Sequence, residues 1–256
     1  MDSESLLVCC KSTRNFFKEH EKVKVVSSAP QIDILDMIGS ENSVIAVGGG
    51  AVIDTAKILS KNPIICFPTT ASGSSATSWS VYWDHRNKKS LKRMLPKEVN
   101  FESKFVQNLS NEVLASTTCD VISHCIDSLV SKKATTESKD YCNEVLDMLD
   151  NQKGTIDLIK AGHIAGKAIE ITGTNLLHSL SYPVTAHYGT PHGLALGYFL
   201  PKISRFLGFD IDHLIKDFNM HLEIDLDFVI NEAFKYEKIN ECKVKLNKII
   251  IKELYK

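Results

Sequence analysis

Short apolar runs alternate with helix-like stretches through the first 110 residues. The helix-like stretches are Arg14–Glu19, Ile32–Ile38 and Ala51–Leu59. The apolar runs cover Ser5–Cys10, Lys22–Ser27, Ser43–Val47 and Asn62–Phe67. Of these, Ser43–Val47 is a continuous β-branched run, which is typical of a strand buried on both faces of a parallel sheet. Strands and helices that alternate over short links predict a doubly wound α/β domain over residues 1–110.

Helical periodicity replaces the strand pattern after residue 110. The sequence predicts helices over Leu109–Val130, Ser138–Leu149, Ile156–Thr174 and Gly193–Phe206, followed by a helical tail rich in Ile and Lys over Asp225–Lys256. No internal repeat or low-complexity linker interrupts the pattern. We therefore expect residues 111–256 to form a second, all-helical domain.

Composition narrows the class of protein further. The 256 residues are 43% hydrophobic and carry a net charge of -1, so no basic excess exists for nucleic acid. No apolar run approaches the roughly 20 residues that span a bilayer, and the acidic start is unlike a secretory signal. The seven cysteines have no metal-type spacing and are interpreted as reduced thiols. We expect a soluble, cytoplasmic protein with neither a nucleic acid nor a membrane as partner.

Gly48, Gly49 and Gly50 join a predicted strand directly to a predicted helix. Glycines there let the backbone approach a phosphate, and the helix N-terminus supplies unpaired N–H groups. A turn that needs positive φ is the alternative, and the triplet is not the G-x-G-x-x-G fingerprint. A second loop of small and hydroxyl residues, Pro68–Ser75, follows the next strand. Two such loops at carboxyl ends of parallel strands are typical of a nucleotide-binding crevice.

Acidic and imidazole side chains recur in the helical half. Asp120 and His124 are four residues apart on one helix face, a spacing that suits either two ligands of one metal ion or a surface pair. His178 closes an apolar helical stretch, and His192 lies in a loop that opens the next helix. A proline and a glycine between these two exclude one straight helix, so the chain can bring the imidazoles together. One carboxylate with three imidazoles suits Fe²⁺ and Zn²⁺ equally well.

Together these segments resemble the iron-containing (group III) alcohol dehydrogenases, which have the dehydroquinate synthase-like fold. The resemblance covers roughly residues 5–205. Gly48–Lys57 (GGGAVIDTAK) is similar to the family's pyrophosphate loop GGGSxxDxAK, and Pro68–Ser75 (PTTASGSS) to its PTTAGTGS loop. Asp120–His124 (DVISH) is similar to its DALSH segment, and His178 and His192 match its two later histidine motifs. The resemblance implies an α/β dinucleotide-binding domain followed by a helical metal-binding domain.

The activity implied by the resemblance is that of a metal-dependent, NAD(P)-linked alcohol dehydrogenase or aldehyde reductase. Fe²⁺ or Zn²⁺ is expected on Asp120, His124, His178 and His192, acting as a Lewis acid toward the carbonyl oxygen. His187 is the expected proton relay, and a homodimer is the expected assembly. The expected cofactor-binding residues are Gly48, Gly49, Gly50, Asp54, Lys57, Thr69, Thr70, Ser72 and Lys89.

A finer resemblance concerns the substrate. Thr174–His192 (TNLLHSLSYPVTAHYGTPH) and Val81–Leu91 (VYWDHRNKKSL) are most similar to the branch that contains phosphonoacetaldehyde reductases. Members of that branch reduce a phosphonate-bearing aldehyde to 2-hydroxyethylphosphonate. Arg86, Lys92 and Arg93 are candidates for binding such a dianion, and a solvated charged turn is the alternative. The implied substrate is a small aldehyde, with phosphonoacetaldehyde as the specific candidate.

The chain departs from the family pattern in several places. Ala51 stands where the pyrophosphate loop has a serine, and Ala76 replaces a common Glu. The first strand ends in Cys9–Lys11, where NAD-preferring members often place an acidic residue. Without that carboxylate, the lysine there or Arg14 can pair with a 2′-phosphate, so NADPH is predicted over NADH. The chain is also shorter than most members, chiefly before residue 5 and around Asp150–Ile156.

Two other functions stay open at this point. A sugar-phosphate cyclase or dehydroquinate synthase-like lyase on the same fold would bind zinc through fewer imidazoles and a Glu. Asp120 at the first ligand position, and the shortage of basic side chains for a sugar phosphate, favour the dehydrogenase. A non-catalytic relative that keeps the fold for binding is the third alternative. Its only support is the shorter chain, and the full set of four candidate ligands speaks against it.

Overall fold

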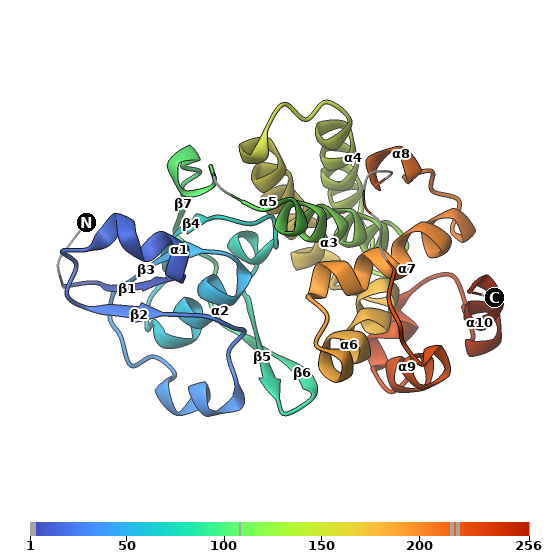
Figure 1. The fold of residues 1–256 in the computed structure, drawn as a ribbon, viewed down its shortest axis with the longest axis horizontal. Coiled ribbons are helices and arrows are strands. Elements are labelled where there is room, and N and C mark those ends of the chain that lie inside the picture. The colour runs from blue at the N-terminus through green and yellow to red at the C-terminus, as the bar shows by residue number, and fades with distance from the viewer. Residues whose placement is uncertain (1–3, 108, 216–217, 219–220, 256) are drawn as a thin grey trace. The chain divides into compact units, whose positions relative to one another are not determined.

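The computed structural model describes residues 4–107, 109–215, 218 and 221–255. The chain forms two compact units, an α/β unit of Met1–Leu109 with Lys153–Gly166 and a helical unit of Ser110–Gln152 with Lys167–Lys256. Figure 1 shows the strands of the first unit in blue to cyan and the helices of the second in green to red. This order, a parallel α/β domain and then a helical domain, confirms the fold class expected from the sequence.

A five-stranded parallel sheet forms the centre of the α/β unit. Its strand order is β2-β1-β3-β4-β7. Each residue of β1 and β3 is buried, which explains why their sequences are unbroken apolar runs. Val52 and Ile53 pack with Val8 and Ala46 in the core that covers one face of the sheet. The strands are β1 (Leu6–Cys9), β2 (Val23–Val25), β3 (Val44–Gly48), β4 (Ile65–Pro68) and β7 (Glu98–Val99).

The connections of this unit differ from the sequence expectation in two ways. The apolar spacing over Ile32–Ile38 gives a 3₁₀ stretch, η2 (Ile32–Met37), in place of the expected α-helix. An antiparallel hairpin of β5 and β6, with His85 at positive φ in its turn, was not expected because five of the six residues of its second strand are polar. The remaining elements are α1 (Lys11–Arg14), η1 (Asn15–Phe17), α2 (Gly50–Leu59), η3 (Ser74–Ala76), β5 (Trp79–Asp84), β6 (Asn87–Lys92) and η4 (Ser103–Phe105).

Helices make up the second unit, and α5 begins in the first unit and ends in this one. Four expected helices, α3, α4, α5 and α7, are present within two residues of their predicted bounds. The predicted helical tail instead forms two short helices and a 3₁₀ stretch, and Lys256 lies outside the described residues. Helix α6 was not predicted, and Pro183, which was expected to help interrupt this segment, lies inside it. No helix in the described part of the chain is long and apolar enough to cross a membrane. The elements are α3 (Asn111–Leu129), α4 (Thr136–Asp150), α5 (Thr155–Thr172), α6 (Leu176–Tyr188), α7 (His192–Phe206), α8 (Asp212–Ile215), α9 (Leu226–Ala233), η5 (Glu237–Glu241) and α10 (Lys248–Leu254).

The break between α5 and α6 corrects one expectation. We expected His178 to close an apolar helix, but α5 ends at Thr172 and Gly173 follows with a φ of 68°. Only glycine adopts that conformation without strain, so the helix stops there. His178 therefore lies in the first turn of α6. A second left-handed glycine, Gly189, ends α6 and lets the chain fold back into α7.

Candidate metal and nucleotide sites

Three helices of the second unit bring the predicted metal ligands together. Asp120 and His124 lie one turn apart on α3, His178 is in the first turn of α6, and His192 is the first residue of α7. The helices α3 and α7 approach closely because Gly193 has no side chain. A Cβ there would lie 1.9 Å from the backbone oxygen of Ser116.

The four side chains surround a small volume at Asp120. Its Oδ1 lies 3.4 Å from Nε2 of both His124 and His178, and 3.9 Å from Nε2 of His192. The ligand atoms of Asp120, His178 and His192 all lie within 4.8 Å of one another. His124 is outside that three-residue group but stacks on His178, with ring centroids 4.7 Å apart. Bonds of about 2.0–2.2 Å from one cation to several nitrogens and oxygens give separations of this size.

Burial and charge around Asp120 favour a bound cation. Burial by itself would raise the pKa of Asp120, but the neighbouring imidazoles hold the pKa of that carboxyl well below its usual range. The pKa of His178 is raised, because its interactions with the carboxyl groups of Asp120 and Asp127 outweigh the opposing effect of burial. Asp120 Oδ1 and His178 Nε2 are both buried and lack a hydrogen-bond partner among the described residues. Buried polar atoms are rarely left unsatisfied, so this donor set fits a divalent metal ion.

Two residues that were not predicted from the sequence contact the Nδ1 atoms of His178 and His192. Asp127 Oδ2 lies 2.9 Å from His178 Nδ1, and Ser181 Oγ lies 3.3 Å from His192 Nδ1. A signal for Asp127 was available, since it is seven residues after Asp120 and so on the same helix face. No comparable signal existed for Ser181, because its contact depends on how α6 meets α7.

The glycine triplet of the first unit serves close packing. None of Gly48, Gly49 and Gly50 is among the residues with positive φ, so the alternative of a turn needing positive φ is wrong. A Cβ on Gly49 would lie 2.7 Å from Thr70 Oγ1, and one on Gly50 would lie 3.0 Å from Ser72 Oγ. The glycines thus let the start of α2 approach the second predicted loop.

The N-terminus of α2 and the loop after β4 together offer polar groups to a phosphate. Gly49 is the N-cap of α2 and has no side chain with which to accept a hydrogen bond from the first N–H groups of the helix. Ser72 Oγ is buried and without a hydrogen-bond partner among the described residues. A helix N-terminus beside a hydroxyl is a suitable environment for an anion. The residues therefore fit the pyrophosphate of a dinucleotide.

Helix α5 holds the second loop in place. A Cβ on Gly162 would lie 2.5 Å from Ala71 Cα, and one on Gly166 would lie 2.4 Å from the oxygen of Gly73. Gly73 itself has a φ of 72°. The loop thus rests directly on the helix backbone, a contact that only glycines on α5 permit.

Lys57 binds protein carbonyls. Its Nζ donates to the backbone oxygens of Ser74, Thr77 and Trp79 at 2.6, 2.7 and 2.9 Å, and its side chain is buried. The lysine thereby ties the segment after the second loop to α2. Its expected contact with the cofactor stays a prediction, and the structure adds a positioning role.

Replacing Lys57 by methionine should lower the free energy of unfolding by at least about 2 kcal/mol, because three carbonyls lose their buried donor and each costs about 1–3 kcal/mol when unsatisfied. Urea unfolding followed by circular dichroism measures the change. Lys61→Met, at an exposed position beyond the end of α2, is the matched control and should stay within about 0.5 kcal/mol of the wild type. Equal stability of the two variants would contradict this role of Lys57.

The buried carboxyl group of Asp54 should make the stability of the protein depend on pH. Burial raises the pKa of Asp54 from 3.8 to about 6, although Lys57 lowers it in part. The folded state then holds the proton more tightly than the unfolded state, so the contribution of Asp54 is present at low pH and is lost as pH rises through 6. Relative to the wild type, the free energy of unfolding of Asp54→Asn should increase by up to about 3 kcal/mol as the pH rises from about 4 to about 7. Urea titrations at several pH values measure this, and parallel curves for the two proteins would refute it.

The remaining predicted residues lie apart from these groups. Lys89 is exposed on β6, in register with Tyr82 of β5. His187 is exposed near the end of α6, with its ring edge-on to Phe228 at 4.8 Å. His187 is outside the group of mutually close ligand atoms formed by Asp120, His178 and His192. The roles proposed for Lys89 and His187 stay predictions.

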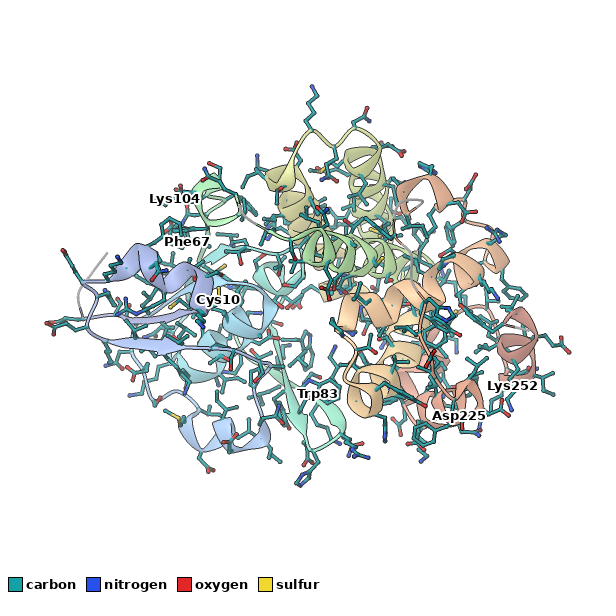
Figure 2. The ribbon with its side chains drawn as sticks, in the orientation of Figure 1. Cys10, Phe67, Trp83, Lys104, Asp225 and Lys252 are labelled. Carbon is teal, nitrogen blue, oxygen red and sulfur yellow. The ribbon has the colours of Figure 1, made fainter. Side chains whose placement is uncertain are left out.

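Lys11 and Arg14, the two basic residues considered for binding a 2′-phosphate, differ in their surroundings. Cys10 lies at the end of β1 (Figure 2), and Lys11, the first residue of α1, is exposed. Arg14 donates to the backbone oxygens of Phe17 and His20, so part of its guanidinium is engaged. Lys11 is therefore the better candidate near that strand end.

The basic residues of the hairpin region do not form one cluster of solvated charges. Arg93 donates to the carbonyls of Lys57 and Ser60 at 3.1 and 2.6 Å, which secures the C-terminus of α2. Lys92 lies 6.0 Å from the centre of the Trp79 ring. Arg86 is exposed in the turn between β5 and β6. Of the three candidates, Arg93 has a structural role.

Comparison with known proteins shows the family. Residues 114–251 match the model of the Fe-containing alcohol dehydrogenase family, C-terminal, and residues 12–108 match that of the iron-containing alcohol dehydrogenases. Phosphonoacetaldehyde reductase of Streptomyces viridochromogenes is 26% identical over 206 residues, covering 63% of this chain and 52% of that protein. 4-Hydroxybutyrate dehydrogenase of Clostridium kluyveri is 27% identical over 212 residues, covering 67% and 57%. The chain thus spans about half the length of these two curated relatives.

Solved structures show the same fold. An iron-containing alcohol dehydrogenase from Thermotoga maritima superposes with a TM-score of 0.81 at 20% identity, covering 98% of this chain and 90% of that one. Sulfoacetaldehyde reductase from Bifidobacterium kashiwanohense, solved with NAD⁺, gives 0.79 at 20% identity with the same coverage. The family model for the C-terminal region matches more than half of the residues. The chain therefore belongs to the iron-containing alcohol dehydrogenase family.

Proposed function

We propose that this chain catalyses the NAD(P)-linked reduction of a small aldehyde, and the reverse oxidation of the alcohol, with a divalent metal ion. The observation that carries the proposal is the group of Asp120, His178 and His192, whose ligand atoms lie within 4.8 Å of one another. His124, at 3.4 Å from Asp120, is proposed as the fourth ligand. Family membership supports the same reaction class.

The proposed metal ligands would serve to stabilise the negative charge that develops on the substrate. A divalent ion bound there would stabilise negative charge on a carbonyl oxygen as hydride arrives. Asp120 contributes the negative charge of the ligand set, which the surrounding imidazoles keep ionised. His192 is the most exposed of the four, with 28% of its side chain accessible, so it faces the side from which a substrate enters.

The cofactor is assigned to the α/β unit. The uncapped start of α2 and the hydroxyl of Ser72 would hold its pyrophosphate. Thr69 and Thr70 are proposed to flank the nicotinamide half. Gly49 and Gly50 let the two loops approach each other, so a side chain at either position would separate the groups that bind the phosphates.

Phosphonoacetaldehyde is the specific substrate that we propose. The resemblance of Thr174–His192 to the phosphonoacetaldehyde reductases supports it, as does the similarity to the Streptomyces viridochromogenes enzyme. Lys11 and the absence of an acidic residue after β1 support NADPH as the preferred reductant. Other relatives act on other substrates by their names, 4-hydroxybutyrate and lactaldehyde among them.

A panel of aldehydes tests the proposal. Protein loaded with Fe²⁺ or Zn²⁺ is mixed with NADH or NADPH and with phosphonoacetaldehyde, succinic semialdehyde, lactaldehyde or sulfoacetaldehyde, and nicotinamide absorbance is followed. We expect phosphonoacetaldehyde to give the highest kcat/KM, NADPH to be preferred, and a chelator to abolish turnover.

Each outcome of the panel has a distinct meaning. Faster turnover of another aldehyde overturns the substrate and leaves the reaction class. A tenfold or greater preference for NADH overturns the cofactor assignment. No turnover of any aldehyde by metal-loaded protein overturns the reductase itself, and a sugar-phosphate cyclase or a binding protein then becomes the better interpretation.

A further inference from the structure

Asp127 is a buried carboxylate that, among the described residues, accepts hydrogen bonds from the start of one other helix. It lies on α3, on the face that carries Asp120 and His124, and its side chain is completely buried. A buried carboxylate is costly unless charges or N–H groups compensate it. The hydrogen bonds of Asp127 therefore indicate what this residue does.

The donors to Asp127 come from the start of α6. Its Oδ2 accepts from the backbone N–H of Asn175 at 2.8 Å and of His178 at 3.3 Å, and its Oδ1 accepts from that of Leu177 at 3.0 Å. A fourth contact joins Oδ2 to His178 Nδ1 at 2.9 Å. Asp127 thus caps α6 and holds the imidazole of its first turn.

The contact with Nδ1 fixes the chemical form of His178. An ionised carboxylate only accepts hydrogen bonds, so Nδ1 must carry the proton. In the neutral imidazole the lone pair is then on Nε2. That nitrogen is the atom that lies 3.4 Å from Asp120 Oδ1, in the group of metal-ligand atoms.

We propose that Asp127 is a positioning residue for the metal centre, holding His178 as the Nδ1-protonated tautomer with its Nε2 lone pair directed at the ion. The inference rests on the metal site of the proposed function and extends it to a residue that does not itself bind the metal. Outer partners of this kind change metal affinity by about 10–100-fold.

Ser181 has the corresponding but weaker contact with His192. Its hydroxyl donates to the carbonyl of His178 at 2.8 Å, so toward His192 Nδ1, 3.3 Å away, it acts as an acceptor. A neutral hydroxyl at a longer distance orients an imidazole less firmly than a carboxylate at 2.9 Å. The structure therefore ranks Asp127 above Ser181 in its effect on metal affinity.

Asn175 offers a control for the capping role. Its amide nitrogen donates to the carbonyl of Asp127 at 2.6 Å, and its side-chain oxygen accepts from the N–H of Leu176 at 2.6 Å. Asn175→Ala therefore weakens the same junction of α3 and α6, and it leaves the bond between Asp127 and His178 Nδ1 in place.

The test compares Asp127→Ala, Asp127→Asn, Ser181→Ala and Asn175→Ala as metal-free proteins of residues 1–256. Zn²⁺ affinity is measured against a competing chelator, and stability without metal by urea unfolding. The tautomer of His178 is followed by ¹⁵N NMR of histidine-labelled protein, with its signals assigned from His178→Gln. These readouts separate an effect on the metal centre from an effect on folding.

We expect Asp127→Ala to lose about 10–100-fold in Zn²⁺ affinity and to lose the Nδ1-protonated signal of His178. Asp127→Asn should keep that signal, because three donors converge where its amide oxygen would lie, and should lose less affinity. Ser181→Ala should lose the least. Asn175→Ala should be less stable than the wild type but keep its affinity and its tautomer.

Equal Zn²⁺ affinity of Asp127→Ala and Asn175→Ala would overturn the proposal. If Asp127→Ala does not fold, the test uses Asp127→Asn. A Zn²⁺ affinity of Asp127→Asn equal to that of the wild type then overturns the proposal. Failure of the proposed function is seen separately, in the wild type alone: a wild-type protein that binds no Zn²⁺ removes both the metal site and this inference.

Discussion

Replacing His178 by alanine is expected to lower affinity for Fe²⁺ or Zn²⁺ by more than about 100-fold, since loss of an outer partner alone costs about 10–100-fold. The proposed aldehyde reduction should fall by at least about 1,000-fold, because stabilisation of a developing oxyanion by a metal contributes several kcal/mol. His178 Nε2 is buried at 3.4 Å from Asp120 Oδ1, so no neighbouring side chain replaces it without a rearrangement of the helices. Metal content after dialysis and steady-state rates measure the two effects.

His213→Ala is the matched control for that experiment. His213 is exposed, and its Nε2 bonds to Asp150 Oδ1 at 2.7 Å, away from the metal ligands. It should keep full metal content. His124→Ala, measured alongside, decides whether the fourth predicted residue is a ligand, because it lies outside the three-residue group. Retention of metal by His178→Ala would refute the assignment of the site.

Gly193→Ala is expected to destabilise the helical unit by about 3 kcal/mol or more, at the upper end of what overpacking costs. Its Cβ would lie 1.9 Å from the backbone oxygen of Ser116, and a helix backbone cannot move aside as a flexible side chain can. The helix α7 must therefore shift away from α3. Because His192 is the preceding residue, metal affinity should fall together with stability. Urea unfolding and Zn²⁺ titration measure these changes.

Gly154→Ala is the control for Gly193→Ala. A Cβ on Gly154 would meet no atom within 4 Å, so this variant should match the wild type in both measurements. A Gly193→Ala protein as stable as Gly154→Ala would show that α3 and α7 are not in backbone contact.

Local patterns were sufficient for most of the fold. The apolar runs of β1 and β3 are buried on both faces of a parallel sheet. Such strands can be recognised in a sequence without knowing which strands they pair with. The β5–β6 hairpin could not be predicted in this way, because the six residues of β6 are largely polar and exposed. The break between α5 and α6 was also missed, since a left-handed Gly173 looks like any other glycine in a sequence.

The candidate site also combines features that the sequence could predict with features that it could not. Asp120 and His124 could be paired from the sequence because helix geometry alone places residues four apart on one face. Gly49 and Gly50 were recognised as a loop, but the sequence could not show that they are needed for contact with Thr70 and Ser72. A contact of Lys57 with the cofactor stays a prediction, and the sequence could not show that its ammonium also donates to three backbone carbonyls.

The amino-acid order was enough to predict the properties that depend on neighbours along the chain: strand and helix periodicity, the order of the two units, and the residue types able to bind a metal. The contacts between helices could be found only in the folded chain: His178 lies next to Asp120, Asp127 contacts His178 Nδ1, and Ser181 contacts His192 Nδ1. The reason is physical. Contacts between helices depend on where each helix ends and how closely two backbones approach, and here single glycines at 173, 189 and 193 set both.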